Sequence, residues 1–229
     1  MESFDQYAKE YDELLKDPLR DRFAGGSDFF IQQKCRIVDQ RLKRTPGRTL
    51  RVLDAGCGQG TAFQFFDRDV HVFGTDISQP MLRPAALRGP VAVQEPLSLP
   101  FADNTFDAVY AFCIYHHIPD EDHVRHMREL HRVVKPGAEV MVFEHNPYNP
   151  VTATIFKRAP IDQGCHMIAP SRLRGIFTDA GLVGLDHGYF LFVPESLHGV
   201  FGALEPALSW LPLGGQYFVA GRKPESTHR

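Results

Sequence analysis

The chain has few cysteines, and they show no spacing typical of a metal site. Its 229 residues include 4 cysteines, namely Cys35, Cys57, Cys113 and Cys165, and no two of them form a CxxC pair. Zinc sites usually take pairs of ligands from one short loop, so we expect no metal. Cysteines spaced this widely are typical of reduced thiols in a reducing compartment.

Long hydrophobic runs are also missing. The N-terminal segment, MESFDQYAKEYDELLKD, is polar and acidic, and it lacks the basic start and the apolar run of a secretory signal. The most apolar stretch, Tyr189–Trp210, is interrupted by charged residues and prolines, so no segment is long enough to cross a bilayer. These absences predict a soluble cytoplasmic protein.

Neither sign of charge dominates. Lys and Arg number 25 and Asp and Glu number 28, so the formal net charge is -3. This charge gives no electrostatic reason to expect a nucleic acid as partner. The hydrophobic fraction of 43% and the charged fraction of 23% are ordinary for a globular protein, and the length fits one domain. The sequence does not indicate an oligomeric state.

From Leu50 onward, short apolar runs alternate with helical segments. Five runs are predicted to be strands, LRVLDA, VHVFGTD, PVAV, FDAVYAF and AEVMVFE, and two more strands are expected near 182–192 and 216–221. The predicted helices cover 61–68, 79–87, 121–134, which ends at Lys135-Pro136-Gly137, and 171–180, for which Ser171 is the expected N-cap. Such alternation favours a parallel sheet covered by helices on both faces.

Segments outside this alternation are expected to cover the carboxyl ends of the strands. Apolar residues at helical spacing predict helices over Ser3–Lys16 and Asp28–Arg44. The long segments His145–Pro170 and Pro194–Gly215 are of the kind that often carries function. We therefore divide a single domain, 1–229, into an N-terminal helical lid (1–46), a core (47–144), and a substrate cap with the last strands (145–229).

The segment VLDAGCGQG, residues 52–60, has the pattern of a nucleotide-binding turn. A strand enters a turn with glycines at Gly56, Gly58 and Gly60, and a helix is expected to follow. The glycines let the backbone approach a ligand, and a helix start offers N–H groups to an anion. Asp76 ends the next strand about twenty residues on, where a ribose-binding carboxylate is expected. An ordinary tight turn and a helix N-cap are the alternatives, and the combination favours ribose.

Several segments in the same order resemble the class I methyltransferases that use S-adenosylmethionine (SAM), and in particular their type 11 group. They are DAGCGQG, GTDISQPML, the run EPLSLPFADNTFDAVYAFCIYHHIPD, and ELHRVVKPGAEVMVFE. The resemblance covers Leu50 to Glu144 and implies an α/β, Rossmann-like three-layer sandwich. Its mostly parallel sheet would have seven strands with an antiparallel last strand. Asp54 before the glycines, and the lack of a Ser/Tyr/Lys catalytic set, count against a nicotinamide oxidoreductase.

The resemblance also implies roles for single residues in SAM binding. Loop 54–60 would cradle the methionine half, Asp76 would hold the ribose, and Ile77 would pack on the adenine. Glu95 lies where the adenine amino group is usually bound, but Pro96 lacks the N–H that often contacts adenine, so Leu97 donates instead or the contact is lost. Tyr11 either covers the SAM carboxylate or packs in its helix. The expected cofactor residues are Tyr11, Asp54, Ala55, Gly56, Cys57, Gly58, Gly60, Asp76, Ile77, Glu95, Pro96, Leu97 and Phe112.

Candidate proton acceptors follow the fourth and fifth strands, at His116, His117, Glu144 and His145. A base assists transfer when the accepting group begins protonated, although each of these residues could serve structure instead. The implied reaction moves the SAM methyl to a small molecule by in-line displacement and leaves S-adenosylhomocysteine. Oxygen is the simplest acceptor atom, in a glycan, lipid or specialised metabolite. Transfer to nitrogen or carbon, and a non-catalytic SAM-binding module, are the alternatives.

The expected cap is rich in side chains that bear on the acceptor. Its aromatic residues favour an apolar acceptor or simply pack the core, and its cations could bind an anion or lie solvated on helix surfaces. The segments EHNPYNP and FKRAPID resemble type 11 enzymes of bacterial glycan, lipid and specialised-metabolite pathways. The residues in question are Tyr148, Phe156, Tyr189, Phe190, Phe192, Phe201 and Trp210, with Lys157, Arg158, Arg172 and Arg174.

Overall fold

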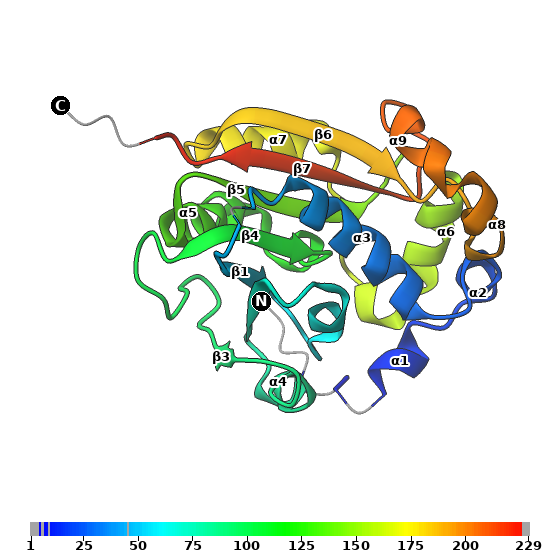
Figure 1. The fold of residues 1–229 in the computed structure, drawn as a ribbon. Coiled ribbons are helices and arrows are strands. Elements are labelled where there is room, and N and C mark those ends of the chain that lie inside the picture. The colour runs from blue at the N-terminus through cyan, green and yellow to red at the C-terminus, as the bar shows by residue number, and fades with distance from the viewer. Residues whose placement is uncertain (1–4, 6, 9, 45, 226–229) are drawn as a thin grey trace.

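The computed structural model describes the whole chain except residues 1–4, 6, 9, 45 and 226–229, and in this part a seven-stranded sheet lies between layers of helices (Figure 1). The strand order is β3-β2-β1-β4-β5-β7-β6. Of these strands, β7 alone runs in the direction opposite to the other six. The strands are β1 (Leu50–Ala55), β2 (Val70–Asp76), β3 (Val91–Val93), β4 (Phe106–Phe112), β5 (Val134–His145), β6 (Val183–Phe190) and β7 (Gln216–Arg222). The predicted Rossmann-like sandwich is confirmed.

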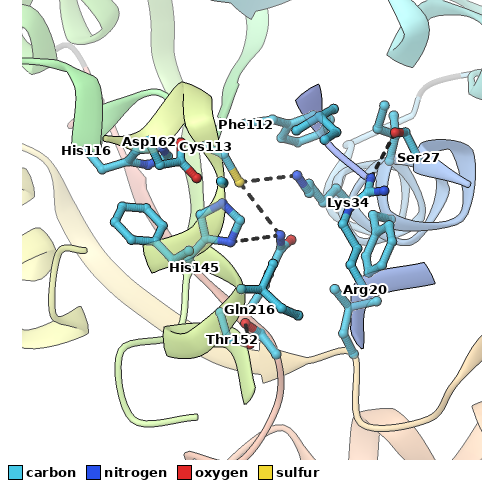
Figure 2. A pocket seen from close by; sticks show the side chains of 18 of the residues that line it. Arg20, Ser27, Lys34, Phe112, Cys113, His116, His145, Thr152, Asp162 and Gln216 are labelled. Atoms are coloured by element: carbon cyan, nitrogen blue, oxygen red, sulfur yellow. Dashed lines mark hydrogen bonds and ion pairs between the residues drawn. The ribbon is translucent and has the colours of Figure 1, made fainter. Parts of the chain in front are cut away.

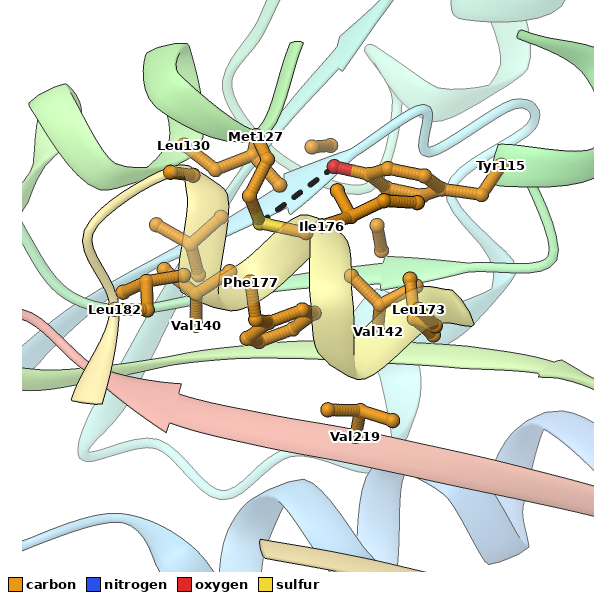
Figure 3. Packing of buried hydrophobic residues seen from close by; sticks show 14 of the residues in the cluster. Tyr115, Met127, Leu130, Val140, Val142, Leu173, Ile176, Phe177, Leu182 and Val219 are labelled. Carbon is orange, nitrogen blue, oxygen red and sulfur yellow. Dashed lines mark hydrogen bonds between the residues drawn. The ribbon is translucent and has the colours of Figure 1, made fainter. Parts of the chain in front are cut away.

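The central strands are buried on both faces. This burial is expected for parallel strands whose sequences are continuous apolar runs. On one face, α5 (His123–Val133) and α7 (Pro170–Asp179) press Met127, Leu130 and Phe177 against the sheet (Figure 3). On the other face lies α3 (Ser27–Arg41). Each fully buried side chain of this size contributes about 1.5–3 kcal/mol, so the two layers hold the strand ends in fixed positions.

The strand order reverses between β1 and β4, because β2 and β3 extend the sheet to one side and β4 and β5 to the other. Open α/β sheets bind their ligands at the carboxyl ends of the strands beside this reversal. The loops that follow β1, β4 and β5 meet there. They begin at Gly56, Cys113 and Asn146, and they carry most of the residues expected to function.

Several short helices gather beside these strand ends (Figure 1). Asp17 caps α2 by accepting from the amides of Leu19 and Arg20, and Asn149 caps α6 through the amides of Val151 and Thr152. Side-chain caps of this kind contribute about 1 kcal/mol each. The helices are α1 (Tyr11–Leu14), α2 (Pro18–Phe23), α6 (Pro150–Arg158), α8 (Glu195–Phe201) and α9 (Glu205–Leu208).

The first predicted helix is described only in part, and one predicted helix start is wrong. Within Ser3–Lys16, residues 3, 4, 6 and 9 lie outside the described residues, Tyr11–Leu14 form the four-residue α1, and Pro18 begins a new helix. Proline fits the first turn of a helix and not its interior. The same rule moves the start of α7, because Pro170 occupies the first helical position and Ala169, without a side-chain bond, precedes it. Ser171 is therefore not the N-cap.

Two predicted segments around the sheet also differ. The helix expected over 61–68 is a 3-10 helix, η2 (Thr61–Phe65), which ends where Phe66 takes extended backbone and stacks on Tyr110. Helix α5 ends at Val133, one residue before the predicted end, whereas β5 starts earlier than predicted and includes Lys135-Pro136-Gly137. The Gly137 amide there donates to the Lys223 carbonyl, which extends the pairing of the strands. The helix α4 (Gln79–Ala85) falls within the predicted 79–87.

Candidate active site

A cavity of about 530 Å³ lies where β1, β4 and β5 end and α2, α3 and α6 cover them. Asp54 and loop 56–59 form one part of its wall, and Phe112 and Cys113 form another. Figure 2 shows His116, Asp162 and His145 on one side and Lys34 and Arg20 on the other, with Gln216 and Thr152 below. The cavity thus connects the glycine turn to all three histidines predicted at the strand ends.

The turn after β1 requires its glycines. Gly56, Gly58 and Gly60 have φ angles of 76°, 51° and 71°, which side chains other than glycine rarely adopt. A Cβ on Gly56 would lie 2.7 Å from Ile114, and one on Gly60 would lie 2.8 Å from Ala85. The amides of Gly56 and Cys57 both donate to the Thr75 carbonyl at 2.8 Å, so the turn is fixed against β2.

An acidic and a basic side chain line the cavity beside this turn. Asp54 is buried at the end of β1, and burial raises its pKa to about 8, against the lowering influence of the Tyr110 hydroxyl. Lys34 reaches in from α3, where only 6% of its surface is exposed. Its Nζ lies 3.3 Å from Cys113 Sγ and 5.2 Å from the centre of the Phe112 ring. The two residues can bind a ligand that carries both a cation and an anion.

The Asp76 carboxylate is held in place by backbone amides. One oxygen accepts from Gly58 N at 2.9 Å and the other from Ser78 N at 2.8 Å. The N-cap of α4 is Ser78, whose Oγ accepts from Met81 N, so Asp76 is not the cap. Each carboxylate oxygen can accept a further bond. Asp76 is partly exposed and can therefore accept from hydroxyl groups of a ligand.

The other predicted cofactor residues divide into three groups. Phe112, Cys57 and Gly58 line the cavity, whereas Ala55 and Gly60 support the turn from outside it. Asp76 lies outside the cavity, as do the four residues expected at the adenine, which are Ile77, Glu95, Pro96 and Leu97. Of those four, Glu95 and Pro96 are exposed. The side chain of Tyr11 lies outside what the structure describes.

The four predicted catalytic residues come together, but they are not equivalent. Glu144 is fully buried and does not line the cavity. Its carboxylate accepts from the Tyr115 amide at 2.8 Å and contacts His116 Nδ1 at 2.6 Å. Glu144 therefore orients His116. The imidazoles of His116, His117 and His145 do line the cavity.

Asp162 joins this histidine cluster from the other side. It is buried in the turn after α6, and its Oδ1 lies 3.4 Å from His116 Nε2 and 3.5 Å from His117 Nε2. His117 Nδ1 lies 3.2 Å from Cys165 Sγ, and His145 Nδ1 lies 3.5 Å from the Gln216 amide nitrogen.

Burial and neighbouring charged groups set the protonation state of each residue in the histidine cluster. Burial opposes the positive form of His116, but the carboxylates of Glu144 and Asp162 outweigh it and raise its pKa to about 10. Burial, with the charge on His116, lowers the pKa values of His117 and His145 to about 4. Despite burial, His116 lowers the pKa of Glu144 to about 2. At neutral pH the cavity therefore presents one cationic and two neutral imidazoles.

Some of the cap aromatic residues line the cavity, but the predicted cap cations do not. Phe156 and Phe192 line the cavity, whereas Tyr189 and Phe190 are buried in the core. Tyr148, Phe201 and Trp210 are exposed. None of the predicted cap cations lines the cavity, because Arg158 faces Asp17 at 3.7 Å, Arg172 pairs with Asp120 at 2.9 Å, and Lys157 and Arg174 are exposed.

Sequence reasoning missed the cations that do reach the cavity, Arg20 and Lys34, and it missed Asp162. Lys34 had a detectable signal, since it lies on the same helix face as Phe30, Ile31 and Val38. A lysine on an apolar face indicates a buried charge. For Asp162, the only sequence signal was its position in the segment FKRAPID, and nothing in the neighbouring sequence indicated that it faces the histidines.

Comparison with known proteins assigns the core to methyltransferases. A family model described as a methyltransferase domain matches residues 53–142. Demethylmenaquinone methyltransferase of Corynebacterium kroppenstedtii is 32% identical over 196 residues, which cover 85% of this chain and 76% of that protein. Probable tRNA methyltransferase 9B of Bos taurus is 30% identical over 137 residues, which are 57% of this chain and 30% of that protein. This chain thus spans less than a third of the latter relative.

Solved structures agree on the fold. A SAM-dependent methyltransferase of Archaeoglobus fulgidus superposes with a TM-score of 0.67, covering 90% of this chain and 98% of that one at 20% identity. At this identity the likeness concerns the arrangement of the helices and strands.

Proposed function

Because this chain belongs to the type 11 family of class I SAM-dependent methyltransferases, we propose that it transfers the methyl group of SAM to an oxygen of a small, largely apolar molecule. The observation that carries the proposal is the single cavity that joins the glycine turn to the histidine cluster. A donor bound at the turn and an acceptor bound at the histidines would share one cavity. In-line transfer requires such an arrangement.

The residues beside the turn suit the methionine half of SAM. Asp54 and Lys34 present an acid and a base to the cavity. Once Asp54 has lost its proton, the two complement an ammonium and a carboxylate. Asp76 would accept from the ribose hydroxyls with its remaining lone pairs, while the amides of Gly58 and Ser78 hold it in place. Phe112 would pack beside the methionine chain. The adenine would lie outside the described cavity, near Ile77 and Leu97.

The bound donor supplies a methyl group already activated on a positively charged sulfur. The protein therefore has to orient the acceptor, exclude water and remove one proton. Positioning of this kind can lower a barrier by about 7–11 kcal/mol. His145 and His117 present neutral imidazoles to the cavity and can accept the proton. Glu144 is a positioning residue, because its contact with His116 lies outside the cavity.

The cavity wall supports an apolar acceptor. Leu19, Phe23 and Phe30 line it from the N-terminal helices, and Ile155 and Phe156 line it from α6. A ring with a hydroxyl group would place its apolar part against these side chains and its oxygen near the histidines. The name of the Corynebacterium relative points to a quinone ring as substrate of that protein. A quinone bears hydroxyl groups only in its reduced, hydroquinone form, so we propose a hydroxyl-bearing ring such as a hydroquinone as the first class to test.

A small molecule fits better than a nucleic acid. Some relatives are named as tRNA methyltransferases, but the chain carries a net charge of -3, and polyanion binding relies on clustered cations. We keep the division into lid (1–46), core (47–144) and cap (145–229) as part of the proposal. It is supported by the cavity residues contributed by α2, α3 and α6. Within the described residues, no helix is both long and apolar enough to cross a membrane.

The test is an acceptor panel with position-resolved products. The chain is incubated with methyl-labelled SAM and with hydroquinones, phenols, amines and tRNA, and S-adenosylhomocysteine is measured for each. We expect release that depends on a hydroxyl-bearing ring, with the label in a methoxy group by ¹³C NMR. Labelled carbon or nitrogen, labelled tRNA, or no turnover with any acceptor by a folded chain that binds SAM would contradict the proposal.

A further inference from the structure

We propose that His116, His117 and Asp162 form a binding site for a divalent first-row metal ion, such as Zn²⁺, in the wall of the cavity. Two imidazoles and one carboxylate are a ligand set that such ions accept. One ligand atom from each residue lies within 4.8 Å of the other two. Figure 2 shows His116 and Asp162 beside each other, on the side of the cavity opposite Lys34.

The spacing of the ligand atoms also fits a shared ion. Asp162 Oδ1 lies 3.4 Å from His116 Nε2 and 3.5 Å from His117 Nε2. N–H···O hydrogen bonds usually span about 2.7–3.2 Å. In a tetrahedral site with bonds of about 2.0–2.1 Å, neighbouring ligand atoms lie about 3.4 Å apart. The two measured distances match the edges of such a tetrahedron.

A second layer of contacts prepares His116 for this role. Glu144 lies 2.6 Å from its Nδ1. His116 is cationic at neutral pH, so a bound ion would displace the proton from Nε2, which faces Asp162. Metal-binding histidines usually donate their other ring N–H to a carboxylate or carbonyl in this way. Glu144 is itself fixed by the Tyr115 amide at 2.8 Å. These contacts lie outside the cavity and hold the imidazole in one orientation.

The site has an open side. All three residues line the cavity, so an ion bound by them would keep a position for a ligand from within it. Three protein ligands with an open position are typical of catalytic metal sites rather than structural ones. The expectation of no metal considered only cysteine pairs on one loop. Here the ligands come from the turn after β4 and the turn after α6, far apart in the sequence.

The ion would act on the acceptor, and this role rests on the proposed methyl transfer. The acceptor hydroxyl oxygen would bind the ion, which favours loss of its proton to His145 or to solvent. A lone pair of that oxygen forms the bond to the methyl carbon, while the carbon–sulfur bond breaks and leaves its electron pair on sulfur. Hydroxyl and SAM become methyl ether, S-adenosylhomocysteine and one proton.

The experiment titrates the metal-free, untagged chain with Co²⁺, followed by visible absorption, and then displaces Co²⁺ with Zn²⁺. We expect one Co²⁺ per chain with the absorption of a tetrahedral or five-coordinate ion. Asp162→Asn and His117→Gln should each weaken binding by at least about 10–100-fold. His166→Ala is the matched control, because His166 is exposed and outside the cluster, and it should bind as the wild type does. Affinity for S-adenosylhomocysteine shows that each variant is folded.

Two results overturn the site. One is a chain that binds S-adenosylhomocysteine but takes up no Co²⁺ at millimolar concentration, and the other is equal Co²⁺ affinity in the wild type, Asp162→Asn and His117→Gln. Methyl transfer at full rate in the metal-free chain overturns the role in the reaction. The titration needs no acceptor and no SAM, so a failure of the proposed methyl transfer leaves its outcome unaffected and is recognised separately.

Discussion

The affinity for S-adenosylhomocysteine should depend on pH through Asp54. In the ligand-free chain, burial raises the pKa of this carboxyl to about 8, so at pH 7 only about one chain in ten carries the carboxylate, and at pH 6 about one in a hundred. The ligand ammonium is expected to bind the charged form, so binding below pH 8 must release a proton. We expect the dissociation constant to rise about tenfold from pH 7 to pH 6.

Other ionisable groups lie beside Asp54. Burial raises the pKa of Asp76 as well, but amide hydrogen bonds from Ser78 and Gly58 oppose the shift. Lys34 favours the Asp54 carboxylate, whereas Asp76 disfavours it. The groups that face Asp54 are Tyr110 on β4, Lys34 and Cys35 on α3, Cys57 in the turn and Asp76 at the end of β2.

Isothermal titration calorimetry measures this effect directly. Titrations at pH 6.0, 6.5, 7.0 and 7.5 in two buffers of different ionisation enthalpy give both the affinity and the protons released. Asp54→Asn is the control, because its amide resembles the protonated acid that dominates in the ligand-free chain. It should fold normally and show a flat pH profile. A wild-type profile as flat as that of Asp54→Asn, with no proton release, would refute the reasoning.

Three further substitutions test the turn, the buried pair and the ribose carboxylate. Gly56→Ala should lower the free energy of unfolding in urea by more than backbone strain alone, which costs about 1–3 kcal/mol. The loss should also exceed that of Gly47→Ala, because Gly47 has the same φ of 76° but nothing lies within 4 Å of a Cβ there. Equal losses in the two variants would contradict the close approach of Ile114 to Gly56. Glu144→Gln should cost about 3–5 kcal/mol, because it breaks a buried ion pair, whereas Asp120→Asn at the surface should cost at most about 1 kcal/mol; similar urea midpoints would argue against the pair. Asp76→Ala should weaken S-adenosylhomocysteine binding by about 3–6 kcal/mol in calorimetry, and unchanged affinity in a folded variant would remove Asp76 from the ribose site.

The sheet could be predicted from the sequence because its signals are local. The run LRVLDA is β1 to the residue, and the turn with alternate glycines follows it as predicted, with positive φ angles at all three. Helix ends were less accurate where proline decided them. Pro18 and Pro170 each start a helix, and the prediction had placed the helix boundaries on neighbouring polar residues instead.

The site could be predicted only in part, because its residues come from distant segments. His116, His117 and His145 were identified since each follows a strand whose carboxyl end faces the ligand side of the sheet. The sequence could not separate them from Glu144, which points away from the cavity. Asp162 reaches the histidines only through the path of the chain after α6. That path is a tertiary property, and no spacing in the sequence encodes it.

A crystal structure of the chain with S-adenosylhomocysteine is the most direct test of the central claim, which is that donor and acceptor share the cavity beneath the cap. The account predicts that the homocysteine part lies in this cavity beside Gly58, with its sulfur on the side open to His117 and His145. Density for the ligand elsewhere, or a sulfur shielded from the histidines by the protein, would contradict it.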